Sequence, residues 1–119
     1  MSISSKKHNI LSNVQLAALK RYLPERYYQK DTEVIYRGHI PQVGFILLFG
    51  KMYLKKTRIQ TDIVIGEVHG VRELYSNSPY RYTVGILKGS SVLIIDRSSL
   101  TELQNTSDNE VRDIITHLL

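Results

Sequence analysis

The chain has 119 residues, no cysteine, and sixteen Lys and Arg against eleven Asp and Glu, so its formal net charge is +5. This length predicts a single domain over residues 1–119 with one hydrophobic core. The lack of cysteine excludes disulfides, thiolate zinc sites and thiol catalysis. No apolar run reaches the ~18 residues that a membrane span needs. The charged start lacks the apolar stretch of a signal peptide, so we expect a cytoplasmic protein.

The N-terminal part predicts a tail followed by one helix. Residues 1–10 are polar and are expected to form a flexible tail. Ser12 and Gln15 have the spacing of a capping box. The apolar spacing that follows predicts a helix over about residues 12–22, ending before Pro24.

The middle of the chain, from residue 26 to residue 97, has short apolar runs separated by glycines. Short runs at this spacing are typical of an antiparallel sandwich, roll or barrel rather than of β-α-β units. We expect six to eight strands, including 34–36, 44–50, 52–57, 63–65, 82–86 and 91–95.

The C-terminal part predicts two short helices. Ser99–Glu102 and Ser107–Glu110 both have the form of a capping box. The second helix carries four aliphatic residues at the spacing of one helix face, namely Val111, Ile114, Ile115 and Leu118.

The sequence offers little for catalysis. Its histidines, His8, His39, His69 and His117, lack the spacing of a metal-binding pair. No nucleophile elbow, phosphate loop or dinucleotide fingerprint occurs. Asp62 and Glu67 lie close in sequence, and we expect both to be solvated surface residues. We therefore predict that the protein is not an enzyme and has no catalytic residue, no metal and no cofactor.

Two segments resemble the signature of cyclic nucleotide-binding domains. Residues 35–50 contain a glycine turn, a loop, an aromatic-aliphatic strand and a second glycine, with matches at Gly38, Phe45, Ile46, Leu48 and Gly50. Residues 70–84 resemble, without a gap, the phosphate-binding cassette G-E-x-A-L-x-x-x-x-P-R-x-A-T-V, with matches at Gly70, Leu74, Pro79, Thr83 and Val84. The resemblance implies a mainly β protein, an eight-stranded β-roll with one N-terminal helix and one or two short C-terminal helices. Catabolite activator-type regulators and kinase regulatory subunits have this architecture.

The departures from the cassette bear on function. The glutamate that bonds the ribose in the family falls on Val71, and the arginine that pairs with the cyclic phosphate falls on Tyr80. The small alanine falls on Tyr82, and the aromatic residue before the glycine falls on His69. Losing two charge-assisted contacts costs roughly 3–6 kcal/mol, on the order of a hundred- to ten-thousand-fold in affinity. The resemblance therefore implies a degenerate member that does not bind cAMP or cGMP.

The degenerate pocket positions are Gly70, Val71, Arg72, Tyr80, Arg81, Tyr82 and Thr83. If the strand side that carries Tyr80 and Tyr82 faces the pocket, their rings fill it. Arg81 is expected to point to the opposite face. Arg72 is the best candidate for a residual anion contact, the alternative being a plain exposed arginine.

The leading functional hypothesis is a stand-alone regulatory or scaffold module of bacterial type that binds another protein, such as a signalling protein. The alternative is a receptor for a non-standard nucleotide or other effector. The candidate contact residues are Tyr75, Tyr80, Val111, Ile114, Ile115 and Leu118. The apolar face of the C-terminal helix either contacts a partner, such as a second copy of the chain in a homodimer, or packs onto its own roll, and both alternatives stay open.

Membrane binding is not expected, and nucleic-acid binding is disfavoured because no recognition motif is present. The cations cluster at one expected hairpin, at Lys51, Lys55, Lys56 and Arg58. This charge aids solubility or attracts an acidic protein surface.

Overall fold

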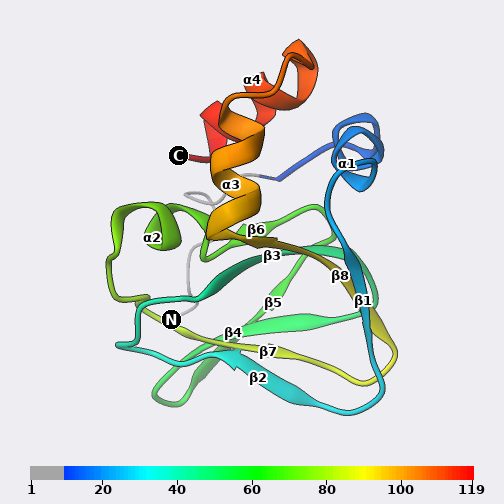
Figure 1. Cartoon of the computed structure of the whole chain (residues 1–119). Coiled ribbons are helices and arrows are strands. Elements are labelled where there is room, and N and C mark those ends of the chain that lie inside the picture. Colours follow the sequence, from blue (N-terminus) through cyan, green and yellow to red (C-terminus); the bar gives the residue numbers. More distant parts are fainter. Residues whose placement is uncertain (1–9) are drawn as a thin grey trace.

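The computed structural model describes residues 10–119, so the expected tail lies outside the described residues except for Ile10. Two four-stranded antiparallel sheets form a roll, in the orders β1-β8-β3-β6 and β2-β7-β4-β5 (Figure 1). The strands are β1 (Glu25–Tyr28), β2 (Thr32–Ile35), β3 (Val43–Phe49), β4 (Met52–Lys56), β5 (Ile59–Ile63), β6 (Val68–His69), β7 (Thr83–Ile86) and β8 (Ser90–Asp96). The helices are α1 (Asn13–Lys20), α2 (Val71–Ser76), α3 (Arg97–Gln104) and α4 (Asn109–Leu118). The expected mainly β, eight-stranded roll is confirmed, and α2 is a helix beyond the expected ones.

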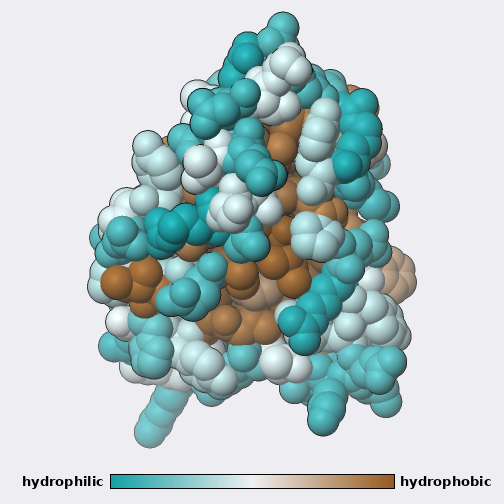
Figure 2. All heavy atoms as spheres, in the orientation of Figure 1, coloured by the Kyte–Doolittle hydropathy of each residue, from teal (hydrophilic) through white to brown (hydrophobic). Residues whose placement is uncertain are grey.

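The sheet that contains β3 and β8 is buried on both faces. Along β3, Ile46 belongs to the core under the helices, whereas Phe45 and Leu47 belong to the core between the two sheets. In β8, Leu93 and Val92 divide in the same way, because side chains alternate along a strand. Burial on both faces explains why these strands appear in the sequence as unbroken apolar runs. Figure 2 shows hydrophobic residues gathered along the middle of one side of the molecule, bordered by hydrophilic ones.

The helix starts agree with the sequence only in part. The capping box of α1 is confirmed, with Gln15 N donating to Ser12 Oγ at 3.2 Å and Ser12 N donating to Gln15 Oε1 at 2.9 Å. The expected box at Ser99–Glu102 is wrong. Asp96, the last residue of β8, caps α3 instead and accepts from Ser99 N at 2.8 Å. The cap of α4 is Asp108 rather than Ser107, again because a carboxylate is placed to accept a backbone N–H.

Two strands were not expected, and one expectation was wrong. The expected strand at 63–65 is in fact the end of β5, since only Ile63 pairs and the next two residues are exposed. β1 carries a single buried side chain, Tyr28, so no apolar alternation marks it. β6 has only two residues.

The apolar face of α4 lies in the protein's own core. Its residues Val111, Ile114, Ile115 and Leu118 are all buried in the cluster under the helices. Of the two alternatives left open by the sequence, the structure has the stripe packed onto its own roll.

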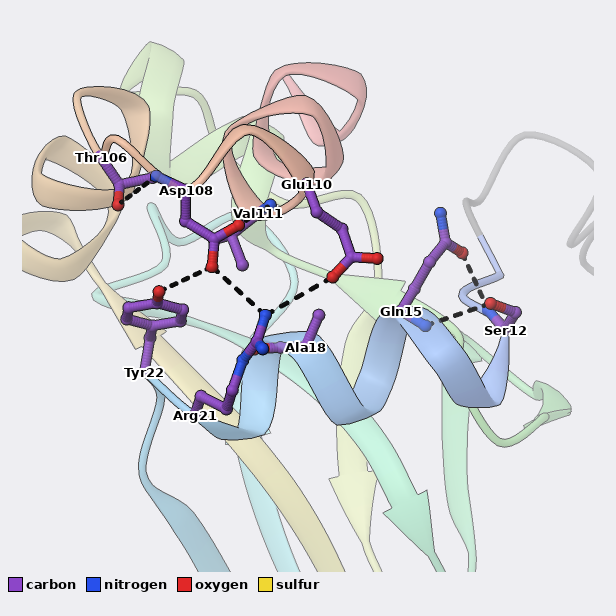
Figure 3. Close-up of polar contacts among 9 residues, drawn as sticks. All are labelled: Ser12, Gln15, Ala18, Arg21, Tyr22, Thr106, Asp108, Glu110 and Val111. Carbon is purple, nitrogen blue, oxygen red and sulfur yellow. Dashed lines mark hydrogen bonds and ion pairs between the residues drawn. The ribbon is translucent and has the colours of Figure 1, made fainter.

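A polar contact joins the N-terminus of α4 to the end of α1 (Figure 3). The Tyr22 hydroxyl donates to Asp108 Oδ2 at 2.7 Å, and Arg21 Nη2 lies 3.2 Å from the same oxygen. Arg21 Nη2 also lies 3.5 Å from Glu110 Oε1. The hydrogen bond from Tyr22, then the backbone N–H of Val111 and the charge of Arg21, lower the pKa of Asp108. Asp108 therefore caps α4 and ties it to α1 at the same time.

Replacement of Asp108 by Ala should lower the urea midpoint at pH 7, because the cap and the tie to α1 are both lost. A carboxyl whose pKa is lowered on folding contributes stability above its unfolded pKa and loses it as the pH falls through the folded pKa. The difference between wild type and Asp108→Ala should therefore shrink as the pH is lowered towards about 3. Asp113→Ala, an exposed carboxylate on the same helix, is the control. Equal effects of the two substitutions would contradict this role.

Candidate functional site

The segment that resembles the phosphate-binding cassette lies at the edge of the roll, between β6 and β7. Gly70 has a φ of +87°, and a Cβ there would lie 2.8 Å from Ile35 Cδ1, so only glycine fits. α2 follows at once, and its Val71 packs against β3, where a Cβ on Gly44 would come within 2.4 Å of Val71 Cγ2. Asn77, also in the left-handed region, ends α2. These glycines allow α2 to lie directly on the sheet.

A buried hydrogen-bonded row crosses the base of this site. His69 Nε2 lies 2.5 Å from Glu67 Oε2, and His69 Nδ1 lies 2.5 Å from the Tyr80 hydroxyl. The exposed fractions of Glu67, His69 and Tyr80 are 1%, 1% and 4%. Val64 N donates to the second carboxylate oxygen at 3.2 Å. Both ring nitrogens of His69 are therefore engaged, Nε2 by the Glu67 carboxylate and Nδ1 by the Tyr80 hydroxyl.

Tyr80 keeps its proton in this setting. Burial raises the pKa of the Tyr80 hydroxyl above its ordinary value, and the negative charges of Glu73 and Glu67 raise it further. A hydroxyl that stays protonated is neutral, and it hydrogen-bonds to His69 Nδ1 either as donor or as acceptor. Tyr80 is therefore held in place by a side chain from β6, at the position where the family has an arginine.

The second cassette tyrosine packs against the first. The rings of Tyr80 and Tyr82 lie 6.0 Å apart at 78°, an edge-to-face contact, and Tyr82 is half-buried. β7 begins only at Thr83, so the two tyrosines precede the regular strand. The Thr83 side chain contacts the loop after β2, where its Oγ1 accepts from Arg37 N at 3.2 Å.

The remaining cassette positions divide between core and surface. Val71 is buried under the helices, in the cluster that does not contain Tyr80. Arg72 and Arg81 are exposed, and neither has a carboxylate within ion-pair distance in the described part of the chain. The anion contact expected of Arg72 stays a prediction.

The contact residues expected from the sequence are mostly covered. Tyr75, on α2, is 51% exposed. Tyr80 and the four aliphatic residues of α4 are buried, so they reach a partner only if the protein rearranges. An apolar stripe at helical spacing is also the pattern of a helix packed on its own core, which is why sequence alone could not separate the two.

Glu67 was expected at the surface, and this expectation is wrong. Its carboxylate is buried on His69, whereas Asp62 is exposed on β5 opposite Tyr53, so the two do not form a pair. The pattern Glu67-Val68-His69 places the two polar residues on the same side of an extended chain. Two polar residues two positions apart, next to a glycine, were the only indication of this buried row in the sequence.

A groove lies between α1 and α4. This open groove of ≈ 300 Å³ is lined by Gln15, Glu110, Asp113, Ile114 and His117.

Across residues 10–119 no group of three or more His, Asp or Glu side chains is arranged to hold a metal ion. No helix in this range is long and apolar enough to cross a membrane.

Neither the protein-family models nor the curated protein sequences compared with this chain match it. Solved structures do match. One, from a cyclic-GMP-dependent signalling pathway that regulates bacterial phytopathogenesis, aligns with a TM-score of 0.76 and 16% identity over 92% of each chain. A cyclic nucleotide-binding domain from Methylobacillus flagellatus aligns with a TM-score of 0.69 and 14% identity, over 96% of this chain and 69% of the other. The catabolite activator protein of Thermus thermophilus aligns with a TM-score of 0.61 and 16% identity, over 91% of this chain and 51% of its own.

Two antiparallel sheets rolled around one core, with helices packed on the outer face of one sheet, place this chain among the helix-flanked β-rolls. Within that class, the fold is that of the cyclic nucleotide-binding domain, as the resemblance implied. The chain spans about half the length of the catabolite activator protein it matches.

Removal of the Tyr80 hydroxyl tests the buried row. Tyr80→Phe leaves the ring in place but removes the hydrogen bond between the hydroxyl and His69 Nδ1, so we expect a loss of about 1–3 kcal/mol in the free energy of unfolding. Urea denaturation at pH 7 measures it. Tyr36→Phe removes the hydroxyl of an exposed tyrosine and should leave the midpoint unchanged. A Tyr80→Phe protein as stable as wild type would show that the hydroxyl contributes nothing to the fold.

Proposed function

We propose that this chain is a degenerate cyclic nucleotide-binding-like domain that does not bind cAMP or cGMP and acts as a regulatory protein-interaction or scaffold module. The observation that carries the proposal is the position of Tyr80. It stands where the cassette arginine stands in the family, and it is buried and bonded to His69. The side chain thus takes up space in the site and offers a phosphate no cation.

Binding of a cyclic nucleotide would require several favourable contacts to be broken. Tyr80 would have to leave His69 and separate from Tyr82, with no arginine to pair with the phosphate in return. Val71, packed in the core, offers no hydrogen bond to a ribose. The missing contacts alone cost roughly 3–6 kcal/mol, which corresponds to on the order of a hundred- to ten-thousand-fold in affinity.

The second candidate is a receptor for a different small effector, such as a non-standard nucleotide. The buried polar row favours it, because polar groups at the base of a site orient a ligand. Against it, these polar groups already bond one another. A bacterial, cytoplasmic setting is part of the main proposal, and its bacterial part is supported by the sources of the Thermus thermophilus and Methylobacillus flagellatus structures.

A homodimer through the C-terminal helix remains a prediction. Since the apolar face of α4 is buried, such a dimer would use its exposed face, which includes Glu110, Asp113 and His117. Light scattering of the full chain over a range of concentrations measures the mass. Two copies per particle that return to one after Asp113→Arg would support this contact, and a single copy throughout would refute it.

Thermal shift titration with cAMP, cGMP and cyclic dinucleotides tests the main proposal directly. A ligand at a hundred times its dissociation constant stabilises by about 2.7 kcal/mol, which moves the melting temperature by several degrees. We expect no shift with cAMP or cGMP up to millimolar concentration. A shift of several degrees at micromolar cAMP or cGMP would overturn the proposal, and a shift with another effector alone would favour the second candidate.

A gain of binding is expected when the two tyrosines are replaced by the residues of the cassette. Tyr80→Arg combined with Tyr82→Ala supplies a cation and opens space, so cGMP affinity should rise by about tenfold or more. Tyr75→Ala, an exposed tyrosine on α2, is the matched control. If the double variant does not fold, Tyr82→Ala alone still opens the site, and isothermal titration with cGMP measures both. Wild-type binding as tight as that of the variants would contradict the view that the tyrosines block the site.

A further inference from the structure

Three loops far apart in the sequence meet at one end of the second sheet. They are residues 36–41 after β2, residues 55–60 around the β4–β5 hairpin, and residues 78–83 before β7. The register Ile35↔Val84 joins β2 to β7, and Lys55↔Thr83 joins β4 to β7, which brings the loops together. In Figure 1 they lie on the left side of the roll.

These loops concentrate positive charge without compensation. They contain five cations and no Asp or Glu. The cations, which we call the basic edge, are Arg37, Lys55, Lys56, Arg58 and Arg81. All five are exposed, and none lies within ion-pair distance of a carboxylate among residues 10–119. The expected cluster at this hairpin is correct for Lys55, Lys56 and Arg58 but wrong for Lys51, which precedes β4 and lies at the other end of that strand. The joining of the hairpin with Arg37 and Arg81 was not visible in the sequence.

The opposite end of the same sheet differs. It carries three lysines, Lys30, Lys51 and Lys88, but also the carboxylates of Asp31 and Glu33. Asp31 Oδ1 accepts from Lys88 N at 2.8 Å, so a carboxylate is built into the turn. The net charge of these residues is therefore +1 at that end, against +5 at the basic edge.

The backbone under the basic edge is held by hydrogen bonds. Gly38 N donates to Tyr80 O at 2.8 Å, and Tyr80 N donates to His39 O at 2.9 Å. Tyr36 and Ile40, in the same loop, are 50% and 42% exposed. The cations Arg37 and Arg81 thus extend from a hydrogen-bonded backbone next to accessible apolar area, and a backbone that is already ordered lowers the entropic cost of binding.

We propose that the basic edge is the docking surface of this domain and that its partner is a protein that presents a segment rich in Asp and Glu. This inference rests on the proposed interaction function and names the surface and the partner chemistry for it. Arginine and tyrosine are enriched at protein interfaces. Four strands about 4.8 Å apart span about 14 Å, which fits a short peptide segment. Duplex binding uses more cations, about 6–10 phosphate contacts.

Fluorescence anisotropy with a defined probe tests the proposal. The probe is a labelled peptide of about a dozen residues in which glutamate alternates with serine, a length that covers this edge when extended. A glutamine-serine peptide of the same length is the uncharged control. The test variant is Arg37→Glu/Arg81→Glu, and the matched control is Lys30→Glu/Lys88→Glu, which changes the net charge equally at the opposite end of the sheet. Equal melting temperatures of the variants and wild type verify folding.

We expect the acidic peptide to bind wild type, with an affinity that falls as salt rises. Reversal of charge at Arg37 and Arg81 should weaken binding more than about tenfold, and the Lys30/Lys88 control should change it by less than about threefold. No binding at low salt, or equal losses in the two variants, would overturn the proposal. Equal losses would mean that only net charge matters.

Two further measurements distinguish this proposal from nucleic-acid binding and from cyclic nucleotide binding. A labelled DNA duplex that binds more tightly than the peptide, and is lost with Arg37→Glu/Arg81→Glu, would overturn the acidic-protein assignment in favour of nucleic acid. The cGMP titration uses the buried site instead. If cGMP binds wild type while the peptide results hold, the proposed function fails and the docking surface stands. If neither cGMP nor the peptide binds, the docking surface fails and the proposed function stands.

Discussion

The pairing of β3 with β8 is the constraint on which the rest of the structure depends. Because this pair lies between two cores, one of its faces supports the helices and the other closes the roll. β6 is attached to the open side of β3, through Phe45↔His69 and Ile46↔Val68. The position of His69, and through it that of Tyr80, follows from this attachment. A change in β3 would therefore reach the candidate site as well as the core.

The base of the candidate site is polar and buried. A row of side chains that donate and accept hydrogen bonds among themselves holds Tyr80 at the arginine position of the cassette. Buried polar groups are costly unless they are bonded, and no buried side-chain polar atom lacks a partner among the described residues. In a receptor, a ligand would supply such bonds. In this chain the protein supplies them, which is the physical basis for proposing an interaction module rather than a nucleotide sensor.

The positive charge of the basic edge and the buried row of the candidate site lie in different parts of the molecule. The buried row faces the interior of the roll, whereas the basic edge lies on the outer end of the second sheet and shares with it only the backbone of the cassette. Tyr80 belongs to both regions, through its side chain inside and its backbone hydrogen bonds to Gly38 and His39 outside. The interior tyrosine thus fixes the exposed loop whose charges we propose to bind a partner.

The sequence by itself determined the capping box of α1, from Ser12 and Gln15, and the places of the main core strands, from local patterns of apolar residues and glycines. Those patterns favoured an antiparallel sandwich, roll or barrel, and the resemblance implied the roll. The resemblance also placed the cassette at residues 70–84, with Tyr80 at the position of the arginine. Only the tertiary structure decided that Glu67 is buried on His69, that α4 hides its apolar face, and that Arg37 and Arg81 join the hairpin lysines. Each of these depends on which residues distant in sequence become neighbours. Local periodicity carries no information about that, because the register between strands and the packing of helices are set by the whole core.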